Sequence, residues 1–226
     1  MSGHRAVLFD ALGTLVELTP PAPRLRDELA RRFGAEVTVA EAQAAIAAEI
    51  GYYRSHLNEG HDPASLAELR RRCGEVLRGA LPERARARLP EGAPMVQALL
   101  TSLHFDAFPD ALVALPRLRN SGARLVVVSN WDVSLHEVLE RVGLAEALDG
   151  TVTSAEAGAR KPDAAIFERA LRLAGVRASD ALHVGDTVAE DVIGARSAGI
   201  EPVLLLRGGG SGPDGVRTIA SLAELL

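Results

Sequence analysis

Short apolar runs alternate with amphipathic segments along most of the chain. Five of the runs have the length and composition of β-strands: Arg5–Phe9, Arg124–Ser129, Gly150–Thr153, Ala181–Gly185 and Pro202–Leu206. The runs Val126–Val128 and Val203–Leu206 are apolar at every position, which is typical of strands buried on both faces. Strands of this kind occur mainly in parallel sheets, because helices then cover both faces of the sheet.

Amphipathic helices are expected between the later strands. Three segments have the required periodicity and end directly before a glycine that suits a left-handed helix cap: Asp110–Ser121, Val133–Val142 and Ala164–Ala174. Strands that alternate with helices favour a parallel sheet with crossover helices. The pattern therefore predicts an α/β fold.

The interval between the first two strands is much longer than a crossover requires. More than a hundred residues separate Phe9 from Arg124, although about a dozen suffice for a crossover. Three helical patterns lie in this interval, and a capping box at Thr38–Glu41 precedes the second: Arg24–Phe33, Ala42–His56 and Ser65–Ala80. Pro82 and Pro90–Gly92 mark the return to the sheet. We predict an inserted α-helical cap domain at residues 17–94 and a core domain formed by residues 1–16 and 95–226.

Composition and charge exclude several classes of protein. The chain has 226 residues and 47% hydrophobic content but no apolar run of the roughly 18 residues that span a membrane. Asp10 interrupts the N-terminal apolar stretch, which argues against a secretory signal. The single Cys73 excludes an internal disulfide, and a net charge of −5 argues against nucleic acid as a partner. We expect a cytoplasmic protein without membrane contact that acts on a small molecule; the oligomeric state stays open.

Polar residues follow the first four predicted strands. In chain order these are Asp10 with Thr14, Ser129–Asp132, Lys161–Asp163, and Asp186 with Asp191. Open α/β sheets bind their ligands at the carboxyl ends of the strands, where these residues are expected to meet. Lys161 is the only lysine among 25 basic residues, which indicates a position that needs a compact ammonium group.

These residue types suit phosphoryl transfer. A carboxylate such as Asp10 can attack phosphorus and form an aspartyl-phosphate. The transferring group carries negative charge, which hydroxyl donors and a cation stabilise. Thr14, Ser129 and Lys161 can supply them. We therefore predict Asp10, Ser129 and Lys161 as catalytic residues and Thr14 as a substrate contact.

A metal ion is expected beside Asp10. Asp186 and Asp191 would repel a phosphate unless a cation lay between them, and together with Asp10 they form an oxygen-only set that suits Mg²⁺. Asn130 and Trp131 follow Ser129 directly, so we also name them as candidate substrate contacts. The cofactor predicted from these residues is Mg²⁺.

The chain resembles the haloacid dehalogenase superfamily of hydrolases along essentially its whole length. The resemblance is carried by four motif regions: Val7–Leu15, Val127–Asn130, Arg160–Asp163, and His183–Asp186 with Glu190–Ala195. The fourth is most similar to the phosphatase members. The helical insertion after the first motif is similar to the cap of subfamily I. The resemblance implies a Rossmann-like three-layer core with a parallel sheet, and an inserted helical cap.

The resemblance also implies roles for individual residues. It implies Mg²⁺-dependent hydrolysis through an adduct on Asp10, with Ser129 on a phosphate oxygen and Lys161 neutralising charge. The metal ligands that it implies are Asp10, Asp186, Asp191 and the main-chain carbonyl of Leu12.

Leu12 is also where the sequence departs from the family pattern. Phosphatases of the superfamily have an aspartate at this position, which protonates the leaving group. Three interpretations follow: a Mg²⁺-dependent phosphatase for a small phosphate monoester or acyl phosphate, a 2-haloacid dehalogenase, or a catalytically silent binding protein. A phosphonatase is set aside, because its cap requires a lysine and the helical insertion has none.

Several other residues are expected to lie outside the chemistry. His56, Glu59 and His61 of the insertion could replace the missing acid, but surface roles are favoured. His183 lies within a strand pattern and is predicted to be a core residue with one hydrogen bond. Arg207–Gly212 could cradle an anion, but a mobile loop before the last helix is favoured.

Overall fold

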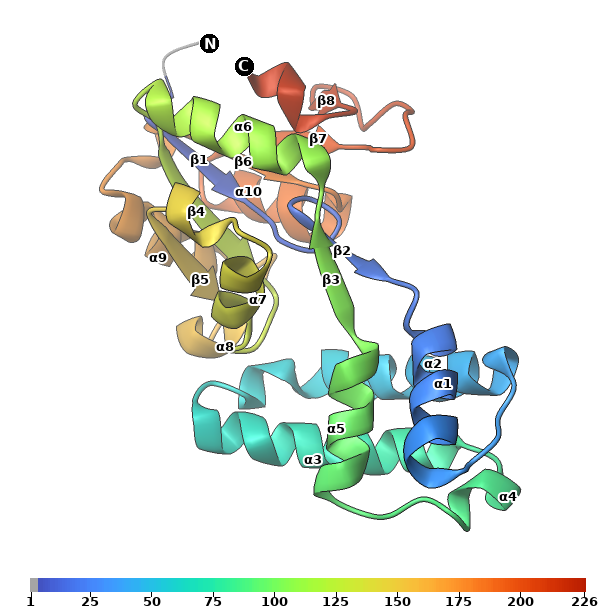
Figure 1. Ribbon diagram of the computed structural model, residues 1–226. Helices are drawn as coiled ribbons and strands as arrows, with labels where there is room; N and C mark the ends of the chain where they lie inside the picture. Colours follow the sequence, from blue (N-terminus) through green and yellow to red (C-terminus); the bar gives the residue numbers. More distant parts are fainter. Residues whose placement is uncertain (1–3) are drawn as a thin grey trace. The chain divides into compact units, whose positions relative to one another are not determined.

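The computed structural model describes residues 4–226, which divide into two compact units (Figure 1). The core unit comprises the chain up to Glu17 together with Asp106–Leu226, and the helical unit comprises Leu18–Phe105. No helix within residues 4–226 is both long and apolar enough to cross a membrane.

A six-stranded parallel sheet forms the centre of the core unit. Its strands, in spatial order, are β5 (Gly150–Thr153), β4 (Arg124–Ser129), β1 (Ala6–Phe9), β6 (Ala181–Gly185), β7 (Glu201–Leu205) and β8 (Arg217–Ile219). Phe9 at the end of β1 lies between Val127 of β4 and Val184 of β6. The central position of β1 therefore places Asp10 between the ends of two neighbouring strands. The five predicted strands are confirmed, whereas β8 was not predicted.

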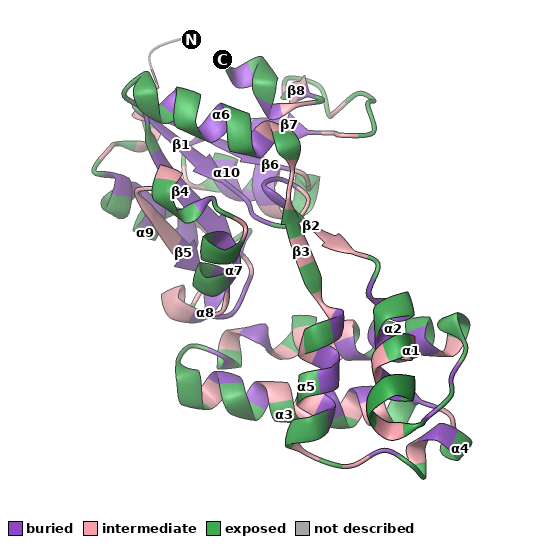
Figure 2. Cartoon of the chain, in the orientation of Figure 1, coloured by how far each residue is buried: buried purple, intermediate pink, exposed green. Residues whose placement is uncertain are grey.

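Helices cover both faces of this sheet, as expected for a Rossmann-like α/β fold. The main helices are α6 (Pro109–Asn120), α7 (Leu135–Arg141), α9 (Ala164–Ala174) and α10 (Ile193–Ser197). Ala6 and Leu8 of β1 pack with Phe167 of α9 and Ala195 of α10 in one apolar cluster. Alternate residues of β1 point to the opposite face, where Val7 is also buried. Figure 2 shows the central strands β1, β4 and β6 as almost entirely buried.

Short elements join these helices and strands. They are α8 (Ser154–Ala157), the π-helical turn Val188–Val192, and the 3₁₀ turns Ala145–Ala147, Ala178–Asp180 and Leu222–Leu225. The last helix expected from the sequence is therefore only a 3₁₀ turn. Two strands, β2 (Val16–Thr19) and β3 (His104–Ala107), pair with each other where the chain passes between the units, and neither was predicted.

The helical unit contains five helices within residues 18–105. They are α1 (Pro21–Phe33), α2 (Val39–His56), α3 (Pro63–Ala80), α4 (Glu83–Arg86) and α5 (Ala93–Ser102), with a 3₁₀ turn at Leu57–Glu59. The predicted capping box is present: the Thr38 hydroxyl accepts a bond from the main-chain N–H of Glu41 at 3.2 Å, and the Glu41 carboxylate accepts the Thr38 N–H at 2.9 Å.

The helical unit extends beyond the boundary drawn from the sequence at residue 94. Met95, Ala98 and Leu99 of α5 join the apolar cluster that contains Leu25 and Ile46. The unit therefore runs to Phe105. The prolines taken as its end instead lie before α4 and α5, inside the unit.

Glu49 occupies a position in α2 that the helical pattern reserves for apolar residues. It shares the buried stripe of α2 with Ala42, Ala45 and Ile46, and the Cys73 thiol donates a hydrogen bond to its carboxyl group. Burial raises the pKa of Glu49 above its usual value of 4.5, although the bond from Cys73 partly opposes this. The folded state therefore favours the protonated form of Glu49.

Glu49→Gln is expected to stabilise the protein by about 1 kcal/mol at pH 8 and to have little effect at pH 4.5. Folding raises the pKa of Glu49. The contribution of the protonated Glu49 to the free energy of unfolding is therefore fully present below pH 4.5 and is lost as the pH rises through the folded-state pKa. Urea unfolding of both proteins at the two pH values measures the difference, and the exposed Glu36→Gln is the control. An equal effect of Glu49→Gln at both pH values would contradict the prediction.

Candidate active site

Asp10 lies directly after β1, and the residue is only 6% exposed. Its main-chain N–H donates to the carbonyl of Val184 in β6 at 2.9 Å, which extends the strand pairing to the carboxylate itself. One carboxylate oxygen, Oδ1, accepts a bond from Ser129 Oγ at 3.1 Å and another from Lys161 Nζ at 2.6 Å. The three residues predicted as catalytic are therefore in direct contact.

Lys161 joins two carboxylates in the interior of the core unit. Its side chain is 1% exposed, and its ammonium donates to Asp10 Oδ1 and to Asp191 Oδ1, both at 2.6 Å. Burial alone would lower the pKa of Lys161, but the charges of Asp10 and Asp191 outweigh burial and raise it. Lys161 therefore remains charged, as a compact ammonium group between the two carboxylates.

Asn130 holds the main chain of this lysine. Its side-chain Nδ2 donates to the Lys161 carbonyl at 3.1 Å, and its Oδ1 accepts the Lys161 N–H at 2.7 Å. Asn130 was expected to contact substrate, but both polar atoms of its amide bind the loop that carries Lys161. Asn130, which directly follows β4, therefore holds the loop between α8 and α9 that carries Lys161.

Asp191 accepts four hydrogen bonds at the end of the π-helical turn. Its Oδ2 accepts from the N–H and the hydroxyl of Thr187 at 3.0 and 2.8 Å, and its Oδ1 accepts from His183 Nε2 at 2.9 Å as well as from Lys161. Burial would raise the pKa of Asp191, but the Lys161 charge and the bond from His183 lower it well below its usual range. Asp191 is therefore a fixed anion.

His183 is buried as expected and makes its bond to Asp191, a residue of the predicted site. Its other nitrogen, Nδ1, is buried without a hydrogen-bond partner among residues 4–226, and its ring packs edge-on against Phe167 with centroids 4.9 Å apart. Strand alternation alone could not predict this pairing, because it depends on the turn at residues 186–191.

Three carboxylates converge at this edge of the sheet. Oxygens of Asp10, Asp186 and Asp191 all lie within 4.8 Å of one another. Burial, together with the charges of Asp10 and Asp191, raises the pKa of Asp186 to about 6. Burial likewise raises the pKa of Asp10, with Lys161 opposing it. A single lysine therefore does not balance the three acids, and a divalent cation would.

Two glycines make room for this convergence. A Cβ on Gly13 would lie 2.1 Å from Asp186 Oδ2, and one on Gly185 would lie 2.1 Å from Asp191 Cγ. Gly13 also has a φ of +85°, which disfavours any other residue. The donor set contains oxygen only, so its chemistry and its charge both fit Mg²⁺.

The remaining predicted contacts differ in accessibility. Thr14 is fully buried, and its hydroxyl has no hydrogen-bond partner among the described residues. Trp131 is also buried, and its carbonyl accepts the N–H of Ala155 at 3.2 Å. Leu12 is 38% exposed although its side chain is apolar. Of these three side chains, only that of Leu12 is substantially open to solvent.

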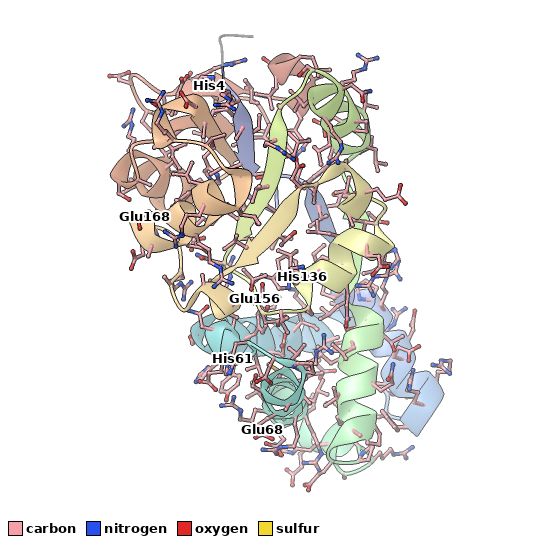
Figure 3. All side chains as sticks on the ribbon, turned by 90° about the vertical axis from the view of Figure 1, so that its left-hand side faces the viewer. His4, His61, Glu68, His136, Glu156 and Glu168 are labelled. Carbon is pink, nitrogen blue, oxygen red and sulfur yellow. The ribbon has the colours of Figure 1, made fainter. Side chains whose placement is uncertain are left out.

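The acid candidates of the helical unit make local contacts. His56 Nδ1 lies 2.8 Å from the Tyr52 carbonyl, and Glu59 pairs with Arg72. In the core unit, His136 Nε2 lies 3.0 Å from a carboxylate oxygen of Glu156, so that α7 and α8 are joined beyond the ends of β4 and β5 (Figure 3). This pair was not singled out from the sequence.

Comparison with known proteins gives the family. The sequence model of the haloacid dehalogenase-like hydrolase family matches residues 4–199. Over 87 residues the chain is 45% identical to a haloacid dehalogenase-like hydrolase domain-containing protein 3 from Bos taurus. The matched region covers 38% of this chain and 35% of that protein. The chain spans between about a third and a half of the length of the curated relatives it matches.

The similar proteins with named activities include a phosphatase and a dehalogenase. A glyceraldehyde 3-phosphate phosphatase from Methanothermobacter thermautotrophicus is 38% identical over 99 residues, or 43% of this chain and 44% of that protein. The structure of a 2-haloacid dehalogenase from Pseudomonas syringae is 25% identical, with a TM-score of 0.69 over 98% of this chain and 96% of that one. Since the family model spans most of the sequence, the chain belongs to the haloacid dehalogenase-like hydrolases.

Proposed function

We propose that this protein is a Mg²⁺-dependent phosphatase that acts on a small phosphorylated metabolite through Asp10. The main support is the cluster of Asp10, Asp186 and Asp191, with oxygens within 4.8 Å of one another beside the charged Lys161. The phosphatase among the relatives supports the same reaction class. We further propose that the helical unit serves as the cap that selects the substrate.

The metal would be held by Asp10, Asp186, Asp191 and the carbonyl of Leu12. When bound, Mg²⁺ would neutralise the acidic cluster and stabilise the negative charge of the phosphoryl group. The four bonds that Asp191 already accepts leave Asp10 and Asp186 as the principal side-chain ligands in this proposal.

Asp10 would act as the nucleophile of a two-step reaction. In the first step a carboxylate oxygen of Asp10 forms a bond to phosphorus, and the bond from phosphorus to the leaving oxygen breaks with its electron pair. Ser129 and Lys161 donate to the phosphoryl oxygens. In the second step water attacks the aspartyl-phosphate, which releases inorganic phosphate and restores Asp10.

Leu12 limits the substrates of this reaction. Its apolar side chain supplies no proton to the departing oxygen, so an alkoxide would leave poorly. Aryl and acyl phosphates release more stable anions. We therefore propose that good leaving groups are preferred.

Leu12 also favours a second candidate, a 2-haloacid dehalogenase. Asp10 would then attack carbon and displace halide, which needs no proton. The match to a dehalogenase structure over nearly the whole chain supports this reading. The acidic cluster argues against it, because displacement of halide needs no divalent cation.

Assays with p-nitrophenyl phosphate, acetyl phosphate and 2-chloropropionate, with Mg²⁺ and with EDTA, test the proposal. We expect release of p-nitrophenol and phosphate that falls at least about 10²-fold in EDTA, because the metal contributes several kcal/mol to stabilising the transition state. Halide release that persists in EDTA would establish the dehalogenase. No turnover of any substrate would identify a binding protein and contradict both enzyme proposals.

A further inference from the structure

Arg207 follows β7, in the segment expected to be a mobile loop. Instead its side chain is three-quarters buried and binds the turn after Asp10: Nη2 donates to the Thr14 carbonyl at 2.6 Å and Nε to the Gly13 carbonyl at 3.2 Å. The first residue of the predicted loop is therefore attached to the segment that carries the proposed nucleophile.

Arg207 is also fixed from its other side. Its Nη1 donates to Asp110 Oδ2 at 3.0 Å, and its guanidinium carbon lies 3.6 Å from the centre of the Phe108 ring. Asp110 is itself held, because the same oxygen accepts bonds from the Ser221 hydroxyl at 2.8 Å and the Leu222 N–H at 2.9 Å. Arg207 is therefore an anchored donor, and not a flexible surface side chain.

The turn that Arg207 holds borders the acidic cluster. Gly13 lies against the carboxylate of Asp186, so closely that a Cβ would overlap it. The Gly13 N–H donates to the Val16 carbonyl at 2.8 Å, and the N–H groups of Leu15 and Val16 both donate to the Ala11 carbonyl. A change in the direction of the Gly13 carbonyl would therefore move the adjacent Leu12–Gly13 peptide. It would also change the space between Asp10 and Asp186.

We propose that Arg207 is a positioning residue that fixes the turn after Asp10, so that the Leu12 carbonyl and the Asp10 and Asp186 carboxylates can share one divalent ion. This inference rests on the proposed phosphatase function. An arginine suits the task because its planar fork reaches two successive carbonyls and a carboxylate together, whereas the single ammonium of a lysine does not.

The variants Arg207→Met and Arg207→Lys test this proposal, with Arg196→Met as the matched control. Arg196 Nη2 donates to the Gly215 carbonyl at 3.0 Å, so the control also removes an arginine that binds a main-chain oxygen of the C-terminal segment. Three measurements are made on each protein: amide hydrogen exchange of residues 10–16, Mg²⁺ affinity by calorimetry, and kcat and KM for p-nitrophenyl phosphate.

For Arg207→Met we expect at least fivefold faster exchange in residues 10–16, about tenfold weaker Mg²⁺ binding and a tenfold lower kcat, with KM within threefold. Arg207→Lys should be intermediate, and Arg196→Met should match the wild type in all three. Unchanged exchange in Arg207→Met would overturn the proposal, as would faster exchange with unchanged Mg²⁺ affinity and kcat. If Arg207→Met does not fold, wild-type exchange and Mg²⁺ affinity in Arg207→Lys would overturn it.

A failure of the proposed function has a different signature. In that case the wild-type protein itself neither binds Mg²⁺ nor releases p-nitrophenol, and the assignment of Arg207 to a metal site falls with it. If the wild type binds and turns over but Arg207→Met does so equally well, the phosphatase stands and only the role of Arg207 is wrong.

Discussion

Asp10→Asn is expected to lower turnover of p-nitrophenyl phosphate by roughly 10⁴-fold or more, because the amide cannot form the phosphorylated intermediate. The substitution keeps the size of the side chain and an oxygen that can accept the bonds from Ser129 and Lys161. It also removes one negative charge from a crowded cluster. The variant should therefore fold, so that the loss reports on chemistry. The measurement is p-nitrophenol release at saturating Mg²⁺, with far-ultraviolet circular dichroism to verify folding.

Asp163→Asn is the matched control for this experiment. Asp163 lies two residues after Lys161 and caps α9 by accepting the Ala165 N–H at 2.9 Å, a bond that asparagine can also accept. Turnover of this variant should stay within about twofold of the wild type. Activity of Asp10→Asn above the uncatalysed background would show that Asp10 is not the nucleophile.

Much of the core unit could be predicted because its signals are local. The apolar runs of β4 and β6 and the glycine after α9 each specify an element without reference to the rest of the chain. β8, by contrast, consists of only Arg217–Ile219 and has no apolar run of its own, since its pairing with β7 defines it. The end of the helical unit was misplaced for a similar reason: the apolar stripe of α5 does not indicate which core it joins.

In the candidate site, too, some contacts could be predicted from the strand pattern and others could not. Asp10, Ser129 and Lys161 were expected to meet because each follows a strand of one parallel sheet, and the structure places them in contact. The bonds of Asn130 to the Lys161 main chain and of Arg207 to the Asp10 turn depend on loop conformations, for which sequence spacing carries no rule. The catalytic roles of Asp10, Ser129 and Lys161 stay predictions until the variants are measured.

Leu12→Asp is expected to raise the rate of hydrolysis of an alkyl phosphate such as glycerol phosphate by about 10²- to 10⁴-fold, the usual contribution of general acid–base catalysis. Leu12 is 38% exposed, so a carboxyl group there need not be buried. Its position two residues from Asp10 places it near like charges, which raise the pKa of a carboxyl and keep it protonated for donation. The gain for p-nitrophenyl phosphate should be much smaller, because p-nitrophenolate leaves without a proton.

Leu12→Asn separates proton transfer from polarity at this position. Asparagine has nearly the same shape as aspartate and retains the main-chain carbonyl proposed as a metal ligand, but it cannot donate an acidic proton to an alkoxide. Its rates on both phosphates should therefore remain within a few fold of the wild type. An equal gain for Leu12→Asn and Leu12→Asp would mean that polarity or a local shift, and not acid catalysis, limits the protein. Unchanged alkyl phosphate hydrolysis in Leu12→Asp would mean that another group already protonates the leaving oxygen, or that the natural substrate is not a phosphate.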